Sequence, residues 1–221
     1  MGEGGGPAGR PDDQDTVAYL NWDIQGANLA PTLTDLTVMV GAETGGPALQ
    51  AAANAATEAS GLDTVALSLL FGQGRSDHAV FADAGVPIVF FTDANTPCWH
   101  TAQDDVTNLD FDKLGQQILT AEALAQEMAT TDELPEYDPT APPATYEDAV
   151  SMLEVVSSAE EDFGLFDAAA QETAAQFLID LNAMVDAGEA AFDDAAVSTL
   201  LGGSVEIVEA LSTGTCDGFL S

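Results

Sequence analysis

The chain has 221 residues, enough for one sizeable domain or a domain with an extension, and its 46% hydrophobic content excludes wholesale disorder. Against 38 acidic residues it has only Arg10, Arg75 and Lys113, so the formal net charge is −35. Such a field repels nucleic acid and anionic membrane surfaces, and neither is expected as a partner. Because the acids are spread along the chain, a solvated acidic surface suited to high salt is favoured over a dedicated cation-binding surface.

Targeting signals and cysteines give little further information. No apolar run reaches about 18 residues, so no membrane-spanning helix is predicted. Residues 1–6 lack the basic end and the apolar stretch of a signal peptide. Cys98 and Cys216 are the only cysteines, and they are far apart and form no C-x-x-C redox pair. They form either one disulfide in an exported protein or two buried thiols, and the sequence leaves both possibilities open.

In chain order, a flexible lead-in is followed by alternating strands and helices. Residues 1–16 are rich in Gly, Pro and Asp, which is typical of a flexible segment. Four apolar segments are predicted as strands: residues 17–24, 36–40, 64–71 and 87–92. Helices are predicted for residues 45–60, from an N-cap at Ser76 to about Gly85, and for residues 111–130. The alternation predicts an α/β fold with a largely buried sheet.

The last of these helices has an apolar periodicity that predicts its buried face. The residues expected on that face are Leu114, Ile118, Leu119, Ala121, Leu124 and Met128.

Composition changes after residue 130. Residues 131–145 contain four prolines, which predicts a linker or an extended strap. Residues 146–221 are predicted to be a C-terminal helical extension, because helical periodicity runs over residues 146–213 and glycines divide it into three or four helices. This part has no titratable cluster with catalytic spacing. We expect it to pack on the α/β part or on a partner.

Aspartate and histidine residues at the ends of predicted strands are the candidates for chemistry. Asp23 ends the first strand within Asn21-Trp22-Asp23-Ile24-Gln25-Gly26, and His100 follows the fourth strand within Trp99-His100-Thr101-Ala102-Gln103-Asp104. The carboxyl ends of strands are where ligands bind in open α/β sheets. Carboxylate oxygen and neutral imidazole nitrogen are zinc ligands.

Together with Gly74-Arg75-Ser76-Asp77-His78, these ordered motifs resemble the co-catalytic two-zinc aminopeptidases of peptidase family M28, clan MH. The resemblance covers roughly residues 17–130, the C-terminal part of that catalytic domain. It implies a mixed sheet flanked by helices, two zinc ions as cofactors, and removal of N-terminal residues from peptide substrates by zinc-activated water. It also implies that Asp23 is a terminal ligand to one zinc and His100 a ligand to the other.

The resemblance gives supporting roles to the neighbouring residues. Ser76, Asp77 and His78 line the site without binding metal. A serine-hydrolase triad is excluded, because adjacent residues on one helical turn point in different directions and no Gly-x-Ser-x-Gly elbow is present.

Three further residues complete the resemblance. Trp99 stands where the family has a tyrosine whose hydroxyl helps to stabilise the oxyanion, and indole cannot place a hydroxyl there. Asp104 is expected to support the site or fix its loop. Arg75 either pairs with a substrate or product carboxylate at the cleft edge or forms a simple salt bridge.

Part of the family pattern has no counterpart before Asp23. A His-x-Asp pair, a bridging aspartate and a Glu-Glu pair that supplies the general base are expected there, but no histidine precedes His78. No catalytic general base is therefore assigned, and the fold is expected to lack its first strands. We expect the chain alone to be inactive, as a fragment or a degenerate relative of a zinc aminopeptidase.

The alternative function is a non-catalytic binding module that holds a partner, such as the missing N-terminal half of the domain. The family resemblance implies an extracellular or periplasmic protein, and this slightly favours the disulfide between Cys98 and Cys216.

Overall fold

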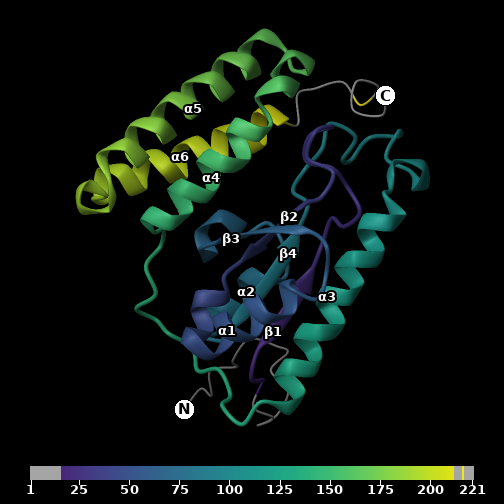
Figure 1. Ribbon diagram of the computed structural model, residues 1–221, viewed down its shortest axis with the longest axis vertical. Coiled ribbons are helices and arrows are strands. Elements are labelled where there is room, and N and C mark those ends of the chain that lie inside the picture. Colours follow the sequence, from purple (N-terminus) through teal and green to yellow (C-terminus); the bar gives the residue numbers. More distant parts are fainter. Residues whose placement is uncertain (1–15, 212–215, 217–221) are drawn as a thin grey trace, which may run out of the picture.

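The structure is a computed structural model that describes residues 16–211 and residue 216. Apart from Thr16, the predicted lead-in over residues 1–16 lies outside the described residues. A central sheet is covered by helices on both faces (Figure 1). The predicted α/β class, with a mixed sheet flanked by helices, is confirmed.

The sheet contains four strands in the order β1-β4-β2-β3. Their bounds are Tyr19–Trp22 for β1, Leu36–Val40 for β2, Asp63–Leu67 for β3 and Ile88–Thr92 for β4. β1 pairs with β4 in parallel and β2 with β3 in parallel, while β2 and β4 are antiparallel. The carboxyl ends of β1 and β4 therefore lie side by side at one edge of the sheet.

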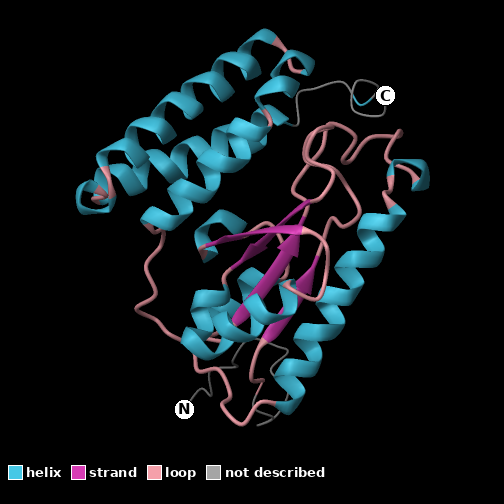
Figure 2. Cartoon of the chain, viewed as in Figure 1, coloured by secondary structure: helices cyan, strands magenta, loops and turns pink. Residues whose placement is uncertain are grey.

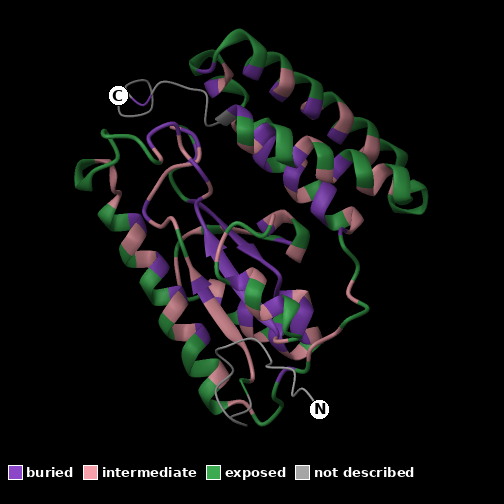
Figure 3. Ribbon diagram, turned by 180° about the vertical axis from the view of Figure 1, so that it is seen from behind, coloured by how far each residue is buried: buried purple, intermediate pink, exposed green. Residues whose placement is uncertain are grey.

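Each face of the sheet packs against its own apolar core. Successive side chains of a strand point to opposite faces, so neighbouring residues enter different cores. Val38, Val40, Ile88 and Phe90 point into one core, and their neighbours Met39, Val89 and Phe91 point into the other. All five residues of β2 and of β4 are buried, which suits central strands covered on both faces (Figure 3).

One face is covered by α1 (Gly46–Thr57) and α3 (Phe111–Thr130). α3 has the bounds predicted from the sequence, because the Asp110 side chain accepts a hydrogen bond from the Lys113 backbone and caps its first turn. On the other face the short helix α2 (His78–Asp83) packs against β1 and β4, and Phe81 stacks on Tyr19 of β1.

The helical extension covers the rest of that second face. It consists of α4 (Tyr146–Ser158), α5 (Ala168–Ala187) and α6 (Asp194–Leu211), which gather into one layer beside the sheet (Figure 2). Met152, Val155 and Val156 of α4 share a core with Val38 and Val40 of β2. Residues 131–145 carry no helix or strand and connect α3 to this layer as an extended strap. Within the described part of the chain, no helix combines the length and apolar character needed to cross a membrane.

The third strand is shorter than predicted. It ends at Leu67, not at Phe71, because the backbone N–H of Ser68 donates to Asp148 Oδ1 (2.9 Å) and its hydroxyl donates to Asp148 Oδ2 (2.7 Å). A 3₁₀ turn over Leu69–Gly72 follows. Since Asp148 belongs to the capping box of α4, this contact also ties the start of the helical extension to the sheet.

The predicted buried face of α3 is wrong in part. Leu124 is fully buried, but Ile118 and Leu119 are exposed, and Lys113, Gln117 and Thr120 are buried in their place. The helix presents Lys113 and Gln117 inward because Asp93, at the end of β4, is fully buried and needs partners there.

Candidate functional site

A cleft lies where the parallel strands β1 and β4 end. Its volume is about 550 Å³, and Asp23, Arg75, Ser76, Trp99 and His100 are among its lining residues. Five of the sequence-predicted site residues therefore meet in one cleft, although they come from three separate segments. Asp77 and Asp104 are exposed and His78 is buried, and none of the three lines it.

Asp23 is exposed directly after β1, and two neighbours orient its carboxylate. The Ser76 hydroxyl donates to Asp23 Oδ2 (2.8 Å), and the Asn21 amide in turn donates to the Ser76 hydroxyl (2.8 Å). The prediction of Ser76 as an N-cap is therefore wrong, because α2 begins at His78 with no side-chain cap and the hydroxyl bonds Asp23. One Asp23 oxygen is fixed by this chain, and the carboxylate faces the cleft.

His100 also lines the cleft, from the loop that follows β4. Its ring stacks on the Trp99 ring, with centroids 3.5 Å apart. Cys98, two residues before His100, forms a disulfide with Cys216. The disulfide prediction thus holds over the alternative of two free thiols, and it joins the His100 loop to the segment after α6.

Four non-glycine residues of the described chain have a positive φ, and all four line this cleft: Ile24 (57°), Gln73 (51°), Ala94 (57°) and His100 (60°). A left-handed backbone costs free energy for such residues, most clearly for β-branched Ile24. Residues in this conformation gather at functional sites, where surrounding contacts hold them. The cleft is therefore the strained region of the fold.

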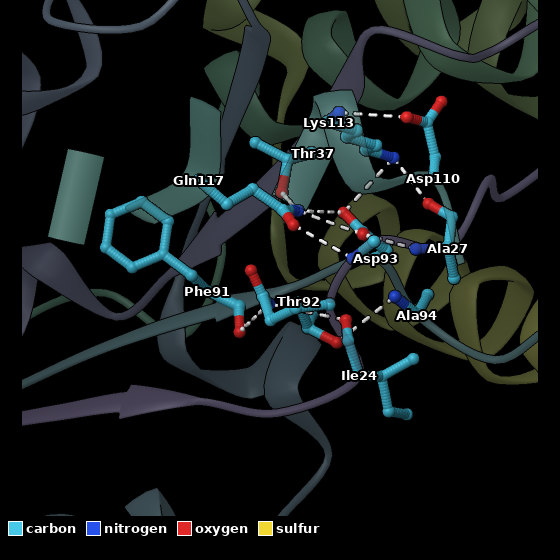
Figure 4. A network of polar contacts seen from close by, with 12 residues as sticks. Ile24, Ala27, Thr37, Phe91, Thr92, Asp93, Ala94, Asp110, Lys113 and Gln117 are labelled. Atoms are coloured by element: carbon cyan, nitrogen blue, oxygen red, sulfur yellow. Dashed lines mark hydrogen bonds and ion pairs between the residues drawn. The ribbon is translucent and has the colours of Figure 1, made fainter. Parts of the chain in front are cut away.

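A buried polar network holds the loop after β1 in place (Figure 4). Asp93 forms an ion pair with Lys113 (3.3 Å), accepts two hydrogen bonds from the Gln117 amide (2.8 and 2.9 Å), and accepts one from the Ala27 backbone (3.0 Å). Lys113 donates to the Ala27 carbonyl (2.5 Å), and the Gln117 carbonyl oxygen accepts from the Gly26 backbone (2.9 Å).

The charges in this network offset one another. Burial lowers the pKa of Lys113, and the attraction of Asp93 opposes that shift. The Asp93 backbone also donates to the Ile24 carbonyl (2.9 Å), so the network fixes the two loops that carry Asp23 and Ala94 against each other. Sequence reasoning did not find these residues. Two sequence features point to this network. Asp93 stands at the end of a buried strand, and Lys113 and Gln117 are four residues apart, so they lie on the same face of one helix.

His78 packs against Phe90 and Gly72, two residues that line the cleft. Its ring is buried, stacks on Phe90 of β4 (4.4 Å between centroids) and leaves no room at Gly72, where a Cβ would lie 2.6 Å from Nε2. Burial lowers the pKa of His78, while the carboxylates of Asp23 and Asp77 oppose the shift. Burial therefore favours the neutral form of the His78 ring.

Asp104, predicted as a supporting residue, and Arg75, predicted as a substrate-binding residue, both lie at the surface. Asp104 donates its backbone N–H to the Thr101 carbonyl (3.3 Å), but the side chain that caps the following turn is Asp105, which accepts from Thr107 (2.8 Å). Arg75 is exposed at the cleft, and among the described residues the only ion pair is that of Lys113 with Asp93. The Arg75 guanidinium thus has no carboxylate partner within that part of the chain and faces solvent.

The donor set for a metal is incomplete in the described residues. Nowhere in residues 16–211 and 216 do three or more His, Cys, Asp or Glu side chains form a group able to hold a metal ion. Asp23 and His100 are the carboxylate and imidazole that line the cleft. Two donors do not fit the ligand set of a two-zinc centre, which needs several donors for each ion and a bridging carboxylate.

The sequence matches peptidase family M28 over residues 8–125, which is more than half of the chain. The chain therefore belongs to this peptidase family. The match ends within α3, so the strap and the helical extension lie outside it. Comparisons with curated proteins and with solved structures gave no match. Family membership supports a metallopeptidase function in general terms and zinc as the family's metal.

Proposed function

We propose that the cleft is one half of a zinc aminopeptidase site that acts on the N-terminal residue of peptides. The observation that carries the proposal is the meeting of Asp23, His100 and Arg75 in one cleft of a chain that belongs to a peptidase family. In this proposal Asp23 and His100 are metal ligands, and zinc would supply the activated water when bound.

Arg75 binds the substrate in this proposal. It lines the cleft, it is exposed, and it has no carboxylate partner among the described residues. Lys113, the other described cation, is buried against Asp93 and cannot reach a ligand. In a chain with a charge of −35, Arg75 is therefore the group that attracts a peptide or product carboxylate.

We further propose that the chain alone is inactive. The described cleft offers two metal donors, and no second carboxylate lines it to act as general base. The remaining ligands and the general base would come from a further polypeptide segment that docks at the cleft. In the family, the N-terminal part of the domain supplies these groups. Nucleic acid and membranes are not partners, since the strong negative charge repels both.

The compartment is proposed from the disulfide. The bond between Cys98 and Cys216 persists in an oxidising environment, which supports an extracellular or periplasmic location.

An activity assay on the full chain tests the half-site. We expect no release of p-nitroaniline from leucyl-p-nitroanilide with or without added zinc. Robust release that a chelator stops and that His100→Ala abolishes would overturn the proposal of inactivity and show that the metal site is complete.

The incomplete donor set also favours a second function, a binding module that holds a peptide without cleaving it. Tryptophan fluorescence of the full chain would report binding of a short peptide, because Trp99 lines the cleft. Arg75→Gln should weaken that binding and Arg75→Lys should retain part of it. If no peptide binds with or without zinc, the cleft is not a peptide site.

A further inference from the structure

One residue of the cleft wall carries a hydrogen-bonding group that the fold does not use. Asn95 follows β4, lines the cleft and is only 6% exposed. Its side-chain nitrogen Nδ2 is buried and has no hydrogen-bond partner among the described residues. Of the side chains in that part of the chain with a buried, unpartnered nitrogen or oxygen atom, Asn95 is the one that lines the cleft. A buried donor without a partner destabilises a fold, so a structural role does not explain this amide.

The position of Asn95 suits contact with a ligand. Its neighbour Ala94 also lines the cleft, and the same loop continues to Trp99 and His100, which line it too. Rotation about the last side-chain torsion of an asparagine is broad, so the amide can turn its nitrogen toward the cleft without movement of the backbone. The oxygen and nitrogen of the amide are nearly indistinguishable in shape, and the turn therefore needs no additional room.

The chemistry of the amide nitrogen selects the group that it binds. The nitrogen donates two hydrogen bonds and accepts none, so its partner is an acceptor oxygen. Arg75 is the charged donor of the cleft and suits a carboxylate. Asn95 is a neutral donor, and the neutral acceptor that every peptide offers is the carbonyl oxygen of its main chain.

We propose that Asn95 donates a hydrogen bond to the carbonyl oxygen of the first peptide bond of a peptide in the cleft. This role rests on the proposed function and adds to it a binding residue that no motif marks. Trp99 stands where the family has a tyrosine hydroxyl, and Asn95 supplies a donor from four positions earlier in the same loop. The cleft then holds a peptide by a neutral donor for its carbonyl group and by Arg75 for its carboxylate.

A pair of peptides tests the role of Asn95 without relying on catalysis. The two are trialanine and the same peptide with sulfur in place of the first peptide-bond oxygen, which keeps the charge but accepts hydrogen bonds poorly. In an NMR titration of the full chain, trialanine should bind more tightly by roughly two- to tenfold, the effect of one neutral hydrogen bond. Asn95→Leu keeps the branched shape and removes the donor, so it should bind the two peptides equally.

Asn108→Leu is the matched control. The Asn108 amide donates to the Gln103 carbonyl (2.5 Å), and Asn108 does not line the cleft. This variant should lower the thermal unfolding midpoint and leave the preference between the two peptides unchanged. Asn95→Leu should show the reverse, a midpoint that does not fall and a lost preference, because no hydrogen bond of the fold is removed. A midpoint that falls in Asn95→Leu as far as in the control would assign the amide to the fold and overturn the proposal.

The wild-type chain gives a reading that does not depend on the folding of a variant. The side-chain NH₂ signals of Asn95 should shift when trialanine is added and shift less with the sulfur analogue. Equal shifts with both peptides, or an equal preference in wild type and Asn95→Leu, would overturn the role of Asn95 and leave the peptide site standing. If neither peptide binds to the wild type, both the peptide site and the role of Asn95 are wrong.

Discussion

Single side chains around the cleft occupy two environments. Asp23, Arg75 and His100 are exposed and point to solvent, whereas His78 and Asp93 are buried behind them. Exposed groups are free to meet a ligand, and buried groups hold the backbone that carries them. Ser76 lies between the two sets, because its hydroxyl accepts from Asn21 and donates to Asp23.

The buried state of His78 predicts an acid-sensitive stability. Its pKa is lowered in the fold, chiefly by burial, so between its folded pKa and the unfolded value of about 6.5 the unfolded chain binds the extra proton. His78 should therefore leave stability intact above about pH 6.5 and reduce it as the pH falls, by at most about 1.4 kcal/mol per pH unit. Urea unfolding at several pH values measures this.

The matched variant is His78→Phe, which keeps a ring on Phe90 and removes the titrating group. Its stability should fall less steeply over the same interval. If wild type and variant have the same slope, His78 is not the group responsible.

At the scale of elements, the helical extension depends on close approach of α5 and α6. A Cβ at Gly203 of α6 would lie 2.2 Å from Phe177 Cδ2 of α5, but a Cβ at Gly202 would meet no atom within 4 Å. Gly203→Ala should therefore destabilise the fold by about 1–3 kcal/mol through overpacking. Gly202→Ala should stabilise it by up to about 1 kcal/mol, because alanine favours a helix interior.

Chemical denaturation of the two variants measures the difference. Equal effects of both substitutions would contradict the packing of α5 on α6.

The disulfide is a second link between elements that are far apart in sequence. It joins residues separated by 118 positions, so it removes much freedom from the unfolded chain. Replacing both cysteines by serine should cost about 2–4 kcal/mol. Urea unfolding in the absence of reductant checks this, and reductant should lower the stability of the wild type but not of the double variant. An unchanged wild type in reductant would count against a structural role.

Sequence reasoning located the elements better than their faces. The apolar periodicity of residues 111–130 and the apolar run of residues 87–92 mark α3 and β4 clearly, because both are local signals. The inward turn of Lys113 and Gln117 depends on Asp93, which is distant in sequence, and local periodicity placed Ile118 and Leu119 on the buried face as well. The end of β3 was missed for the same reason, since Asp148 lies 80 residues after Ser68.

The site was predictable only where motifs carry it. Asp23 and His100 stand in recognisable runs of residues, and the structure places both in one cleft. Val208 of α6 also lines the cleft, but no sequence motif marks it, and its place there follows only from the fold.

For the whole molecule, the charge of −35 is the dominant property. Repulsion among carboxylates opposes compaction, and salt screens it, since the Debye length falls from about 10 Å at 0.1 M to about 3 Å at 1 M. The thermal unfolding midpoint should therefore rise as sodium chloride is increased over this range. Sucrose at matched osmolality does not screen charge, so it should raise the midpoint less. A midpoint that falls with salt would contradict this.

The most direct test of the half-site is the zinc content of the dialysed full chain together with zinc affinity from titration calorimetry. The account predicts no tightly held zinc and only weak zinc binding, which His100→Ala and Asp23→Asn should each reduce. Asp132→Asn, at an exposed position of the strap, should leave the titration unchanged. Two zinc ions that survive dialysis, or binding that does not depend on Asp23 and His100, would contradict the account.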